Sequence, residues 1–242
     1  MNQSAIRQMI WKESYESLPS LILGIFMQAG FTAVALHSRL IPDVAVMIFC
    51  IIMSWIFAAI WGMSPVGGER QNGSFGFLMT LPIRPWKVLL SKLVVAMIGV
   101  AIPLTASWFL FVVMAGEREL VRPFMQYGFL GGMVGSTSMT CWVICVGIRQ
   151  PTEARVAMTG LGVLFVMWLL LVAISALNLI TSQIGLLLTA LTPIGPFAGL
   201  QSYTMNQSTS YWYTSLFLNA LVMALLFFYA SLRFAKPCKT RG

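Results

Sequence analysis

Charged residues are scarce in this sequence of 242 residues, in which Asp, Glu, Lys and Arg together make up 9%. Hydrophobic residues make up 58%, and the mean hydropathy is +0.84. Soluble globular domains carry about 25% charged residues, so this composition excludes that class. The apolar runs also lack the alternation of barrel strands, and the sequence therefore predicts an all-α integral membrane protein.

Side chains that could carry out chemistry inside a membrane are equally few. The only histidine is His37 and the only aspartate is Asp43, and both fall outside the predicted spans. We interpret the middles of these spans as apolar or merely Ser and Thr, which disfavours an enzyme and an ion-coupled transporter. The chain has neither a GxSxG nor a GxxxxGK[ST] pattern. We therefore expect it to bind no metal, nucleotide or other cofactor itself.

Six stretches without Asp, Glu, Lys, Arg or His are long enough to cross about 30 Å of hydrocarbon as helices. They cover Leu18–Leu36, Val44–Met63, Leu93–Ala115, Phe124–Ile148, Val156–Leu177 and Tyr211–Leu232. We interpret residues 1–242 as one membrane domain built from these six spans.

The fifteen Lys and Arg residues predict the orientation, because positive residues near span ends stay on the cytoplasmic side. With both termini inside, only Arg39, Arg118 and Arg122 fall in outer loops. We therefore expect a multi-pass protein of the cell inner (plasma) membrane with both termini cytoplasmic. The net charge of +8 then reflects topology, and nucleic acid is not an expected partner.

Residues 1–17 predict a helix lying in the inner membrane interface, with Pro19 marking a bend into the first span. The expected lipid-facing residues are Ile6, Met9 and Ile10, the expected water-facing residues are Arg7, Lys12 and Glu13, and Trp11 is expected at the headgroup level. A cleaved signal peptide is less favoured, because Glu13 and Glu16 stand where such a peptide carries positive charge.

Glycines in the fourth predicted span indicate close helix packing. Gly128, Gly131, Gly132 and Gly135 form two overlapping GxxxG spacings. No Lys-Ser or Lys-Thr follows them, so a nucleotide loop is not indicated. Cys141 and Cys145 share a helix face in the same span, and packing is favoured over metal binding because no His or acid accompanies them.

The longest inner segment, residues 64–92, has a pattern of its own. Helix-breaking residues precede an acid at Glu69, and Phe75, Leu78 and Met79 follow at helical spacing before Pro82. A second helix start follows at Arg84-Pro85-Trp86-Lys87. The short amphipathic helix could dock into a groove of another protein or lie flat on the lipid surface, and the residues alone favour neither.

The stretch "GERQNGSFGFLMTLPIRPWKVLLSKL" resembles the corresponding loop of permease subunits of ABC-2-type exporters. The resemblance extends to the interfacial helix with "IWKE", the six spans and a long outer segment before the last span. In that family this loop forms the coupling helix that docks on a cytoplasmic ATPase, which favours docking here. The implied docking residues are Glu69, Arg70, Gly73, Ser74, Phe75, Leu78, Leu81, Pro82, Arg84 and Lys87. Gly76 and Pro85 depart from the family pattern.

The outer segment, residues 178–210, is apolar from Leu179 to Leu191 but too short there to cross the membrane. "TPIGPFAGL" then breaks any helix, so the segment predicts short re-entrant outer helices, with an ordinary amphipathic outer loop as the alternative. In ABC-2 permeases such helices cap the exit path.

The resemblance implies the permease subunit of an ATP-driven exporter. Its implied partners are a cytoplasmic ABC ATPase subunit, which would bind Mg-ATP, and a second permease subunit in a homo- or heterodimer. Because the predicted spans hold no charged group, the expected cargo is hydrophobic or amphipathic, such as a lipid, a peptide antibiotic or a drug. A non-transporting membrane assembly or sensor subunit paired with an ABC ATPase is the alternative.

Overall fold

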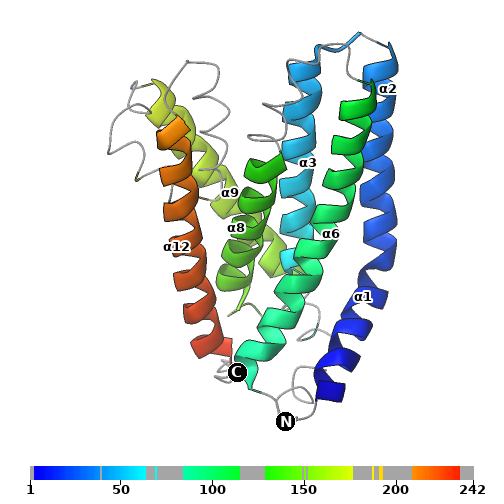
Figure 1. Ribbon diagram of the computed structural model, residues 1–242. Coiled ribbons are helices and arrows are strands. Elements are labelled where there is room, and N and C mark those ends of the chain that lie inside the picture. Colours follow the sequence, from blue (N-terminus) through cyan, green and yellow to red (C-terminus); the bar gives the residue numbers. More distant parts are fainter. Residues whose placement is uncertain are drawn as a thin grey trace.

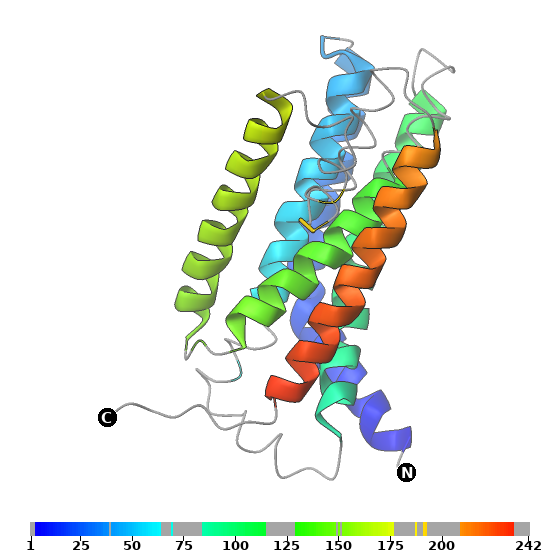
Figure 2. The same ribbon diagram turned by 90° about the vertical axis from the view of Figure 1, so that its left-hand side faces the viewer.

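The described part of the chain forms a bundle of long helices in a computed structural model (Figures 1 and 2). The structure describes residues 3–38, 40–63, 69, 84–114, 129–148, 150, 152–176, 187, 191–192 and 209–234. Its elements are α1 (Gln3–Ile25), the π-helix η1 (Phe26–Gly30), α2 (Phe31–Ser38), α3 (Asp43–Met63), α6 (Pro85–Met114), α8 (Leu130–Gly147), α9 (Glu153–Ala176) and α12 (Thr209–Phe234).

Five helical stretches are long and apolar enough to cross a membrane. They are Arg7–Ser38, Ala45–Met63, Trp86–Met114, Leu130–Gly147 and Tyr213–Phe234. The prediction of an all-α, multi-pass membrane protein is confirmed at this level. The remaining predicted span falls on α9, where the apolar stretch Ala154–Leu170 is shorter, so the count of six stays a prediction.

The N-terminal part of the chain differs from the expected arrangement of a separate interfacial helix followed by the first span. Helix α1 runs without interruption through Pro19 to Ile25, and η1 and α2 continue it to Ser38. Proline removes one backbone hydrogen bond and crowds the preceding turn, yet a long helix can absorb this by curving. The predicted interfacial helix and first span are therefore one continuous helical stretch.

Helix α8 lies at the centre of the bundle, against α3, α6, α9 and α12. Its glycines Gly131, Gly132 and Gly135 are buried, and a Cβ added at Gly132 would lie 3.1 Å from Leu104 Cδ2 on α6. On α3, a Cβ at Gly62 would lie 3.0 Å from Val143 Cβ on α8. Small residues thus bring these helices close together, as is common in membrane bundles. Gly128 lies outside the described residues.

Helix α6 begins at Pro85, where the sequence predicts a second helix start, and continues without a break into the predicted third span. Proline suits a first helical turn, where its missing N–H would have no intrahelical partner. The first residue of α1, the first residue of α6 and the last residue of α12 all lie at the lower end of the bundle in Figure 1. We call this end the charged end, for the reason given below.

One part of the predicted outer segment is described, and it lies against α12. The Asn219 side-chain amide donates to the Thr192 backbone carbonyl at 2.9 Å, and both residues are buried. Asn219 follows the first residue of α12 by ten positions, or about 15 Å along the helix. At Thr192, the chain therefore lies against the middle of α12 and not against the beginning of that helix. Most of residues 178–210, including the predicted re-entrant helices, lies outside the described residues.

Candidate functional site

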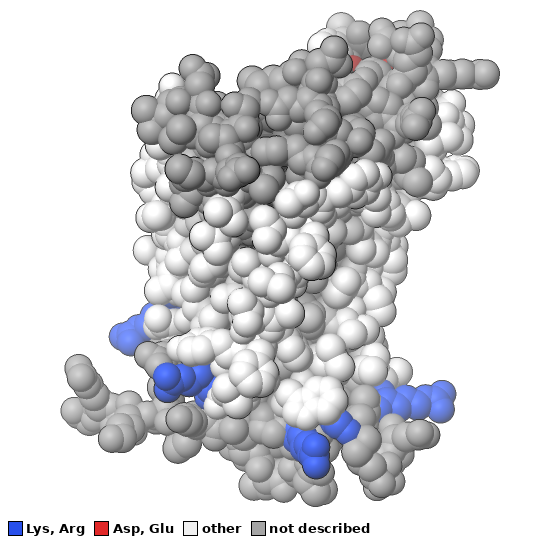
Figure 3. All heavy atoms as spheres, turned by 60° about the vertical axis from the view of Figure 1, so that its left-hand side comes forward, with Lys and Arg blue, Asp and Glu red and all other residues white. Residues whose placement is uncertain are grey.

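The positively charged side chains that the structure describes gather at one end of the bundle. Figure 3 shows Lys and Arg in a band near the lower end of the molecule. The Lys and Arg residues within the described part of the chain are Arg7, Lys12, Arg84, Lys87, Lys92, Arg155 and Arg233. Six of them are exposed or half-exposed, whereas Lys92, two turns into α6, is buried.

Lys92 is among the largest side chains that the structure buries almost completely, with 2% of its surface exposed. Its ammonium group donates to Glu13 Oε1 on α1 at 2.5 Å and to Glu69 Oε1 at 2.8 Å. Glu69 belongs to the inner segment between α3 and α6. We call Lys92, Glu13 and Glu69 the ion trio. It joins three separate parts of the chain through one cation.

An apolar cluster at the charged end packs together the helices that carry the ion trio and their neighbours. Val88 and Leu89 on α6 pack with Ile144 and Ile148 at the end of α8 and with Ala230 and Phe234 on α12. Met9, one turn before Glu13 on α1, packs against the same cluster. Helices α1, α6, α8 and α12 thus meet at the charged end, so a displacement of α6 there is transmitted to its neighbours through close-packed side chains.

The electrostatic balance of the ion trio is uneven, because two carboxylates share one ammonium group. Burial raises the pKa of the Glu69 carboxyl above its ordinary value near 4.5. The positive charge of Lys92 and its hydrogen bond lower that pKa, while the negative charge of Glu13 raises it further. Burial is the largest of these effects, so Glu69 holds its proton to higher pH than an exposed glutamate does.

The predicted docking residues are only partly described. Glu69 is buried in the ion trio, Arg84 is exposed just before α6, and the Lys87 ammonium lies 5.3 Å from the centre of the Trp86 ring. Arg70, Gly73, Ser74, Phe75, Leu78, Leu81 and Pro82 lie outside the described residues, and so does the predicted coupling helix. Docking on an ATPase therefore stays a prediction.

The residues of the predicted interfacial helix are arranged differently from the expectation. Met9 packs against protein rather than lipid, and Glu13 binds Lys92 rather than facing water. Trp11 is exposed and stacks on Tyr15 with ring centres 5.8 Å apart, while Lys12 pairs with Glu16 at 3.6 Å. The side of α1 that faces the bundle is thus the one with Met9 and Glu13. Ile10 is half-buried, and the Ile6 side chain lies outside the description.

The expectation that the spans hold only apolar residues, Ser and Thr is wrong at Gln28 and Asn219. The Gln28 amide donates to the Cys50 carbonyl and to Ser54 Oγ, both at 3.0 Å, and thereby joins η1 to α3. Thr32 Oγ1 donates to the Gln28 carbonyl at 2.7 Å. This buried polar cluster was visible in the sequence as a single glutamine within an apolar run.

The importance of Lys92 was also not predicted. The sequence marks it as one more positive residue next to the third span, and nothing local shows that two acids approach it. Its partners lie 79 and 23 positions earlier in the chain. A useful signal was the rarity of acids at this end, because a buried lysine in a membrane helix requires a partner and few candidates exist.

Among the described residues, no three His, Cys, Asp or Glu side chains lie close enough together to hold a metal ion. Comparison with models of known protein families found no match, and a search of curated proteins found no relative.

Proposed function

We propose that this chain is the membrane-spanning permease subunit of an ATP-driven exporter of the ABC-2 type. It would move a hydrophobic or amphipathic molecule out of the cytoplasm, with energy from Mg-ATP bound by a separate ATPase subunit. The ion trio carries the proposal: Lys92 on α6 holds both Glu69 of the inner segment and Glu13 of α1. The resemblance of residues 69–87 to a coupling loop supports the same function.

The ion trio suits a part that transmits force. Moving one carboxylate away breaks its hydrogen bond to the buried ammonium, and a hydrogen bond to a charged group contributes about 1.5–3 kcal/mol. A movement of Glu69 is therefore expected to pull α6, and Glu13 is expected to take α1 along. Because α1 continues through η1 into α2, a displacement at the charged end can reach the opposite end of the bundle.

The charged end faces the cytoplasm, in agreement with the positive residues gathered there, and both termini lie on that side. A cytoplasmic ABC ATPase docks on the loop that contains Glu69, and a second permease subunit, identical or related, completes the transporter. The protein belongs in the cell inner (plasma) membrane.

Two glutamates on α1 provide a matched test of force transmission. Glu13 binds Lys92 and its side chain is 15% exposed, whereas Glu16, three residues further on, is 58% exposed and pairs only with Lys12 among the described residues. Each is changed to alanine in a chain that is co-expressed with a candidate ABC ATPase subunit and reconstituted in nanodiscs. We expect Glu13→Ala to keep the ATPase bound but to lower cargo-stimulated ATP hydrolysis severalfold, and Glu16→Ala to behave as wild type.

Docking is tested separately with Glu69→Ala, Phe75→Ala and Leu78→Ala, by measuring how much ATPase co-purifies. If all three variants keep the ATPase fully, the loop is not the docking site. A wild-type complex that binds the ATPase but neither moves an amphipathic fluorescent dye nor responds to it would instead favour the assembly or sensor subunit.

A further inference from the structure

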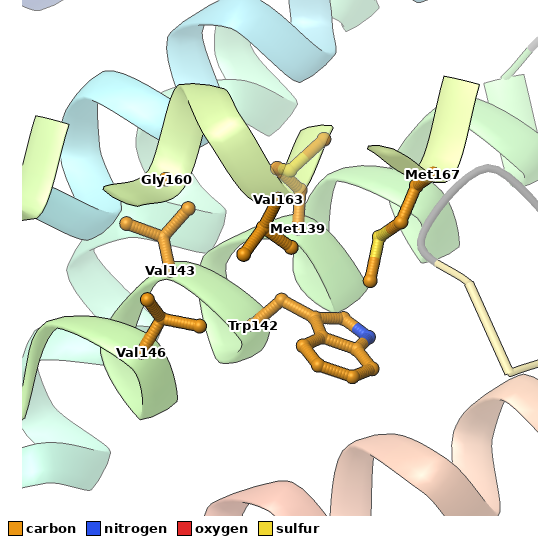
Figure 4. Close-up of a pocket in the computed structure, with 7 residues that line it drawn as sticks. All are labelled: Met139, Trp142, Val143, Val146, Gly160, Val163 and Met167. Carbon is orange, nitrogen blue, oxygen red and sulfur yellow. The ribbon is translucent and has the colours of Figure 1, made fainter. Parts of the chain in front are cut away.

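A narrow crevice separates parts of α8 and α9 (Figure 4). The crevice and its open mouth hold about 200 Å³ of empty space, and no part of it is wide enough for a water molecule. Its lining is uncharged and almost wholly apolar, with Met139 and Trp142 on α8 and Gly160 and Met167 on α9 among its residues. Such a lining suits an aliphatic chain.

Among the side chains that line the crevice, only that of Trp142 carries a hydrogen-bond donor, its indole N–H. The indole Nε1 is buried and has no hydrogen-bond acceptor among the described residues. In Figure 4 this nitrogen lies on the side of the ring nearest to Met167. The indoles of Trp61 and Trp108 also have no acceptor within the described residues, but they do not line the crevice. A buried donor without an acceptor is costly, and here a water cannot fit to supply one.

Helix α9 is placed so that the crevice can widen. It lies at the edge of the bundle and follows α8 after a short connection, residues 148–152 (Figure 2). Leu161, Phe165 and Trp168 are more than half exposed, so much of α9 faces away from the other helices. Gly160 leaves the wall of the crevice flat, because a Cβ there would make only an ordinary contact with Val143 at 3.8 Å.

We propose that the crevice between α8 and α9 binds an aliphatic chain bearing one uncharged hydrogen-bond acceptor, as in the acyl ester of a membrane lipid. The chain would pack along the valine and methionine side chains, and the ester carbonyl would accept the Trp142 indole N–H. Binding would move α9 outward by the width of the chain. This site does not depend on the proposed ATPase coupling, because it lies on helices that do not carry the ion trio.

The test uses two photoactivatable probes that differ only in the acceptor. These are a diazirine-labelled methyl hexadecanoate and a diazirine-labelled octadecane of the same chain length, each added to the purified full chain in nanodiscs. We expect the ester to label the peptides that line the crevice about fivefold more than the alkane, the ratio that one neutral hydrogen bond gives. Trp142→Phe should remove this preference, whereas Trp168→Phe, a change on the exposed side of α9, should keep it.

A second pair of variants tests the space itself. Gly160→Leu places a side chain in the crevice, whereas Gly162→Leu places one where nothing lies within 4 Å. We expect Gly160→Leu to reduce labelling by both probes and Gly162→Leu to leave it unchanged. Equal labelling by ester and alkane in the wild type would overturn the acceptor role of Trp142. Unchanged labelling in Gly160→Leu would show general contact with bulk lipid and overturn the site.

Discussion

Lys92 shows how one charged residue can be held within a membrane helix. An isolated ammonium is costly there, but two carboxylates enclose this one. If both carboxylates are ionised, the ion trio carries a net negative charge, and protonation of one of them leaves a neutral group. Because burial raises the pKa of Glu69, this carboxyl takes up a proton at higher pH than an exposed glutamate does.

This raised pKa predicts a pH dependence of stability. Between the ordinary pKa near 4.5 and the raised pKa, the folded chain binds more protons at Glu69 than the unfolded chain does. The contribution of Glu69 to the free energy of unfolding is therefore fully present below about pH 4.5 and is lost as pH rises through the raised value. Glu69→Gln cannot titrate and should lack this decline.

The measurement is the thermal midpoint of unfolding of both proteins in detergent over a series of pH values. We expect the midpoint of the wild type, relative to that of Glu69→Gln, to fall as pH rises. A difference that stays constant or grows with pH would contradict the assignment of the raised pKa to Glu69.

Gly99 illustrates a second residue-level constraint. The Trp61 ring lies directly on Gly99, and a Cβ added there would overlap the six-membered part of the ring. Trp61 is only 7% exposed, so it has little room to move. Gly99→Ala should therefore lower the free energy of unfolding by about 1–3 kcal/mol.

Gly162→Ala is the control for this substitution, because nothing lies within 4 Å of a Cβ at that position. It should be neutral or stabilising by up to about 1 kcal/mol, since alanine favours a helix more than glycine does. Thermal unfolding of the two variants separates the effect of crowding from that of helix propensity. Equal midpoints would mean that the ring can move aside.

At the scale of elements, the first helical stretch is held to α3 by its π-helical turn. Gln28 lies within η1, and its side chain makes two hydrogen bonds to α3. Thr32, one turn further on, donates its hydroxyl to the Gln28 backbone carbonyl. The polar cluster thus fixes the point at which α1 passes into α2.

Gln28→Leu should lower the thermal midpoint of unfolding, because it removes both donors while Ser54 and the Cys50 carbonyl stay buried. Two neutral hydrogen bonds correspond to about 1–3 kcal/mol. Gln8→Leu is the matched control, because Gln8 is exposed on α1. An equal effect of both substitutions would show that the cluster does not hold the two helices together.

The helix limits could be predicted because charges, prolines and apolar runs are local signals. The second predicted span begins at Val44 and α3 at Asp43, and the sixth begins at Tyr211 and α12 at Thr209. The inward side of α1 could not be predicted in the same way. Met9 and Glu13 face the bundle because residues far along the chain, including Lys92 on α6, contact them. Amphipathic spacing alone cannot distinguish a helix face that packs on protein from one that faces lipid.

At the scale of the whole molecule, the orientation in the membrane can be tested by labelling. Leu40 is 85% exposed in the turn between α2 and α3, and Arg84 is exposed at the opposite, charged end. In a chain with Cys238→Ser, a membrane-impermeant maleimide added to intact spheroplasts should label Leu40→Cys. It should label Arg84→Cys only after the membrane is permeabilised.

The control is the Cys238→Ser chain without an introduced cysteine, treated with the same maleimide. It should not be labelled, because Cys50, Cys141 and Cys145 lie within the helices. Labelling of Arg84→Cys in intact spheroplasts would place the charged end outside and would remove the basis for a cytoplasmic ATPase partner.

The order of the ion trio along the chain bears on how the protein is made. Both carboxylates, at positions 13 and 69, precede Lys92, so a ribosome synthesises them first. N-terminal segments can begin to fold before synthesis is complete. When α6 enters the membrane, Glu13 and Glu69 have therefore already been synthesised, and both can pair with Lys92. A chain permuted to place α6 first would have to insert this lysine without either counter-ion, and we expect it to insert less efficiently.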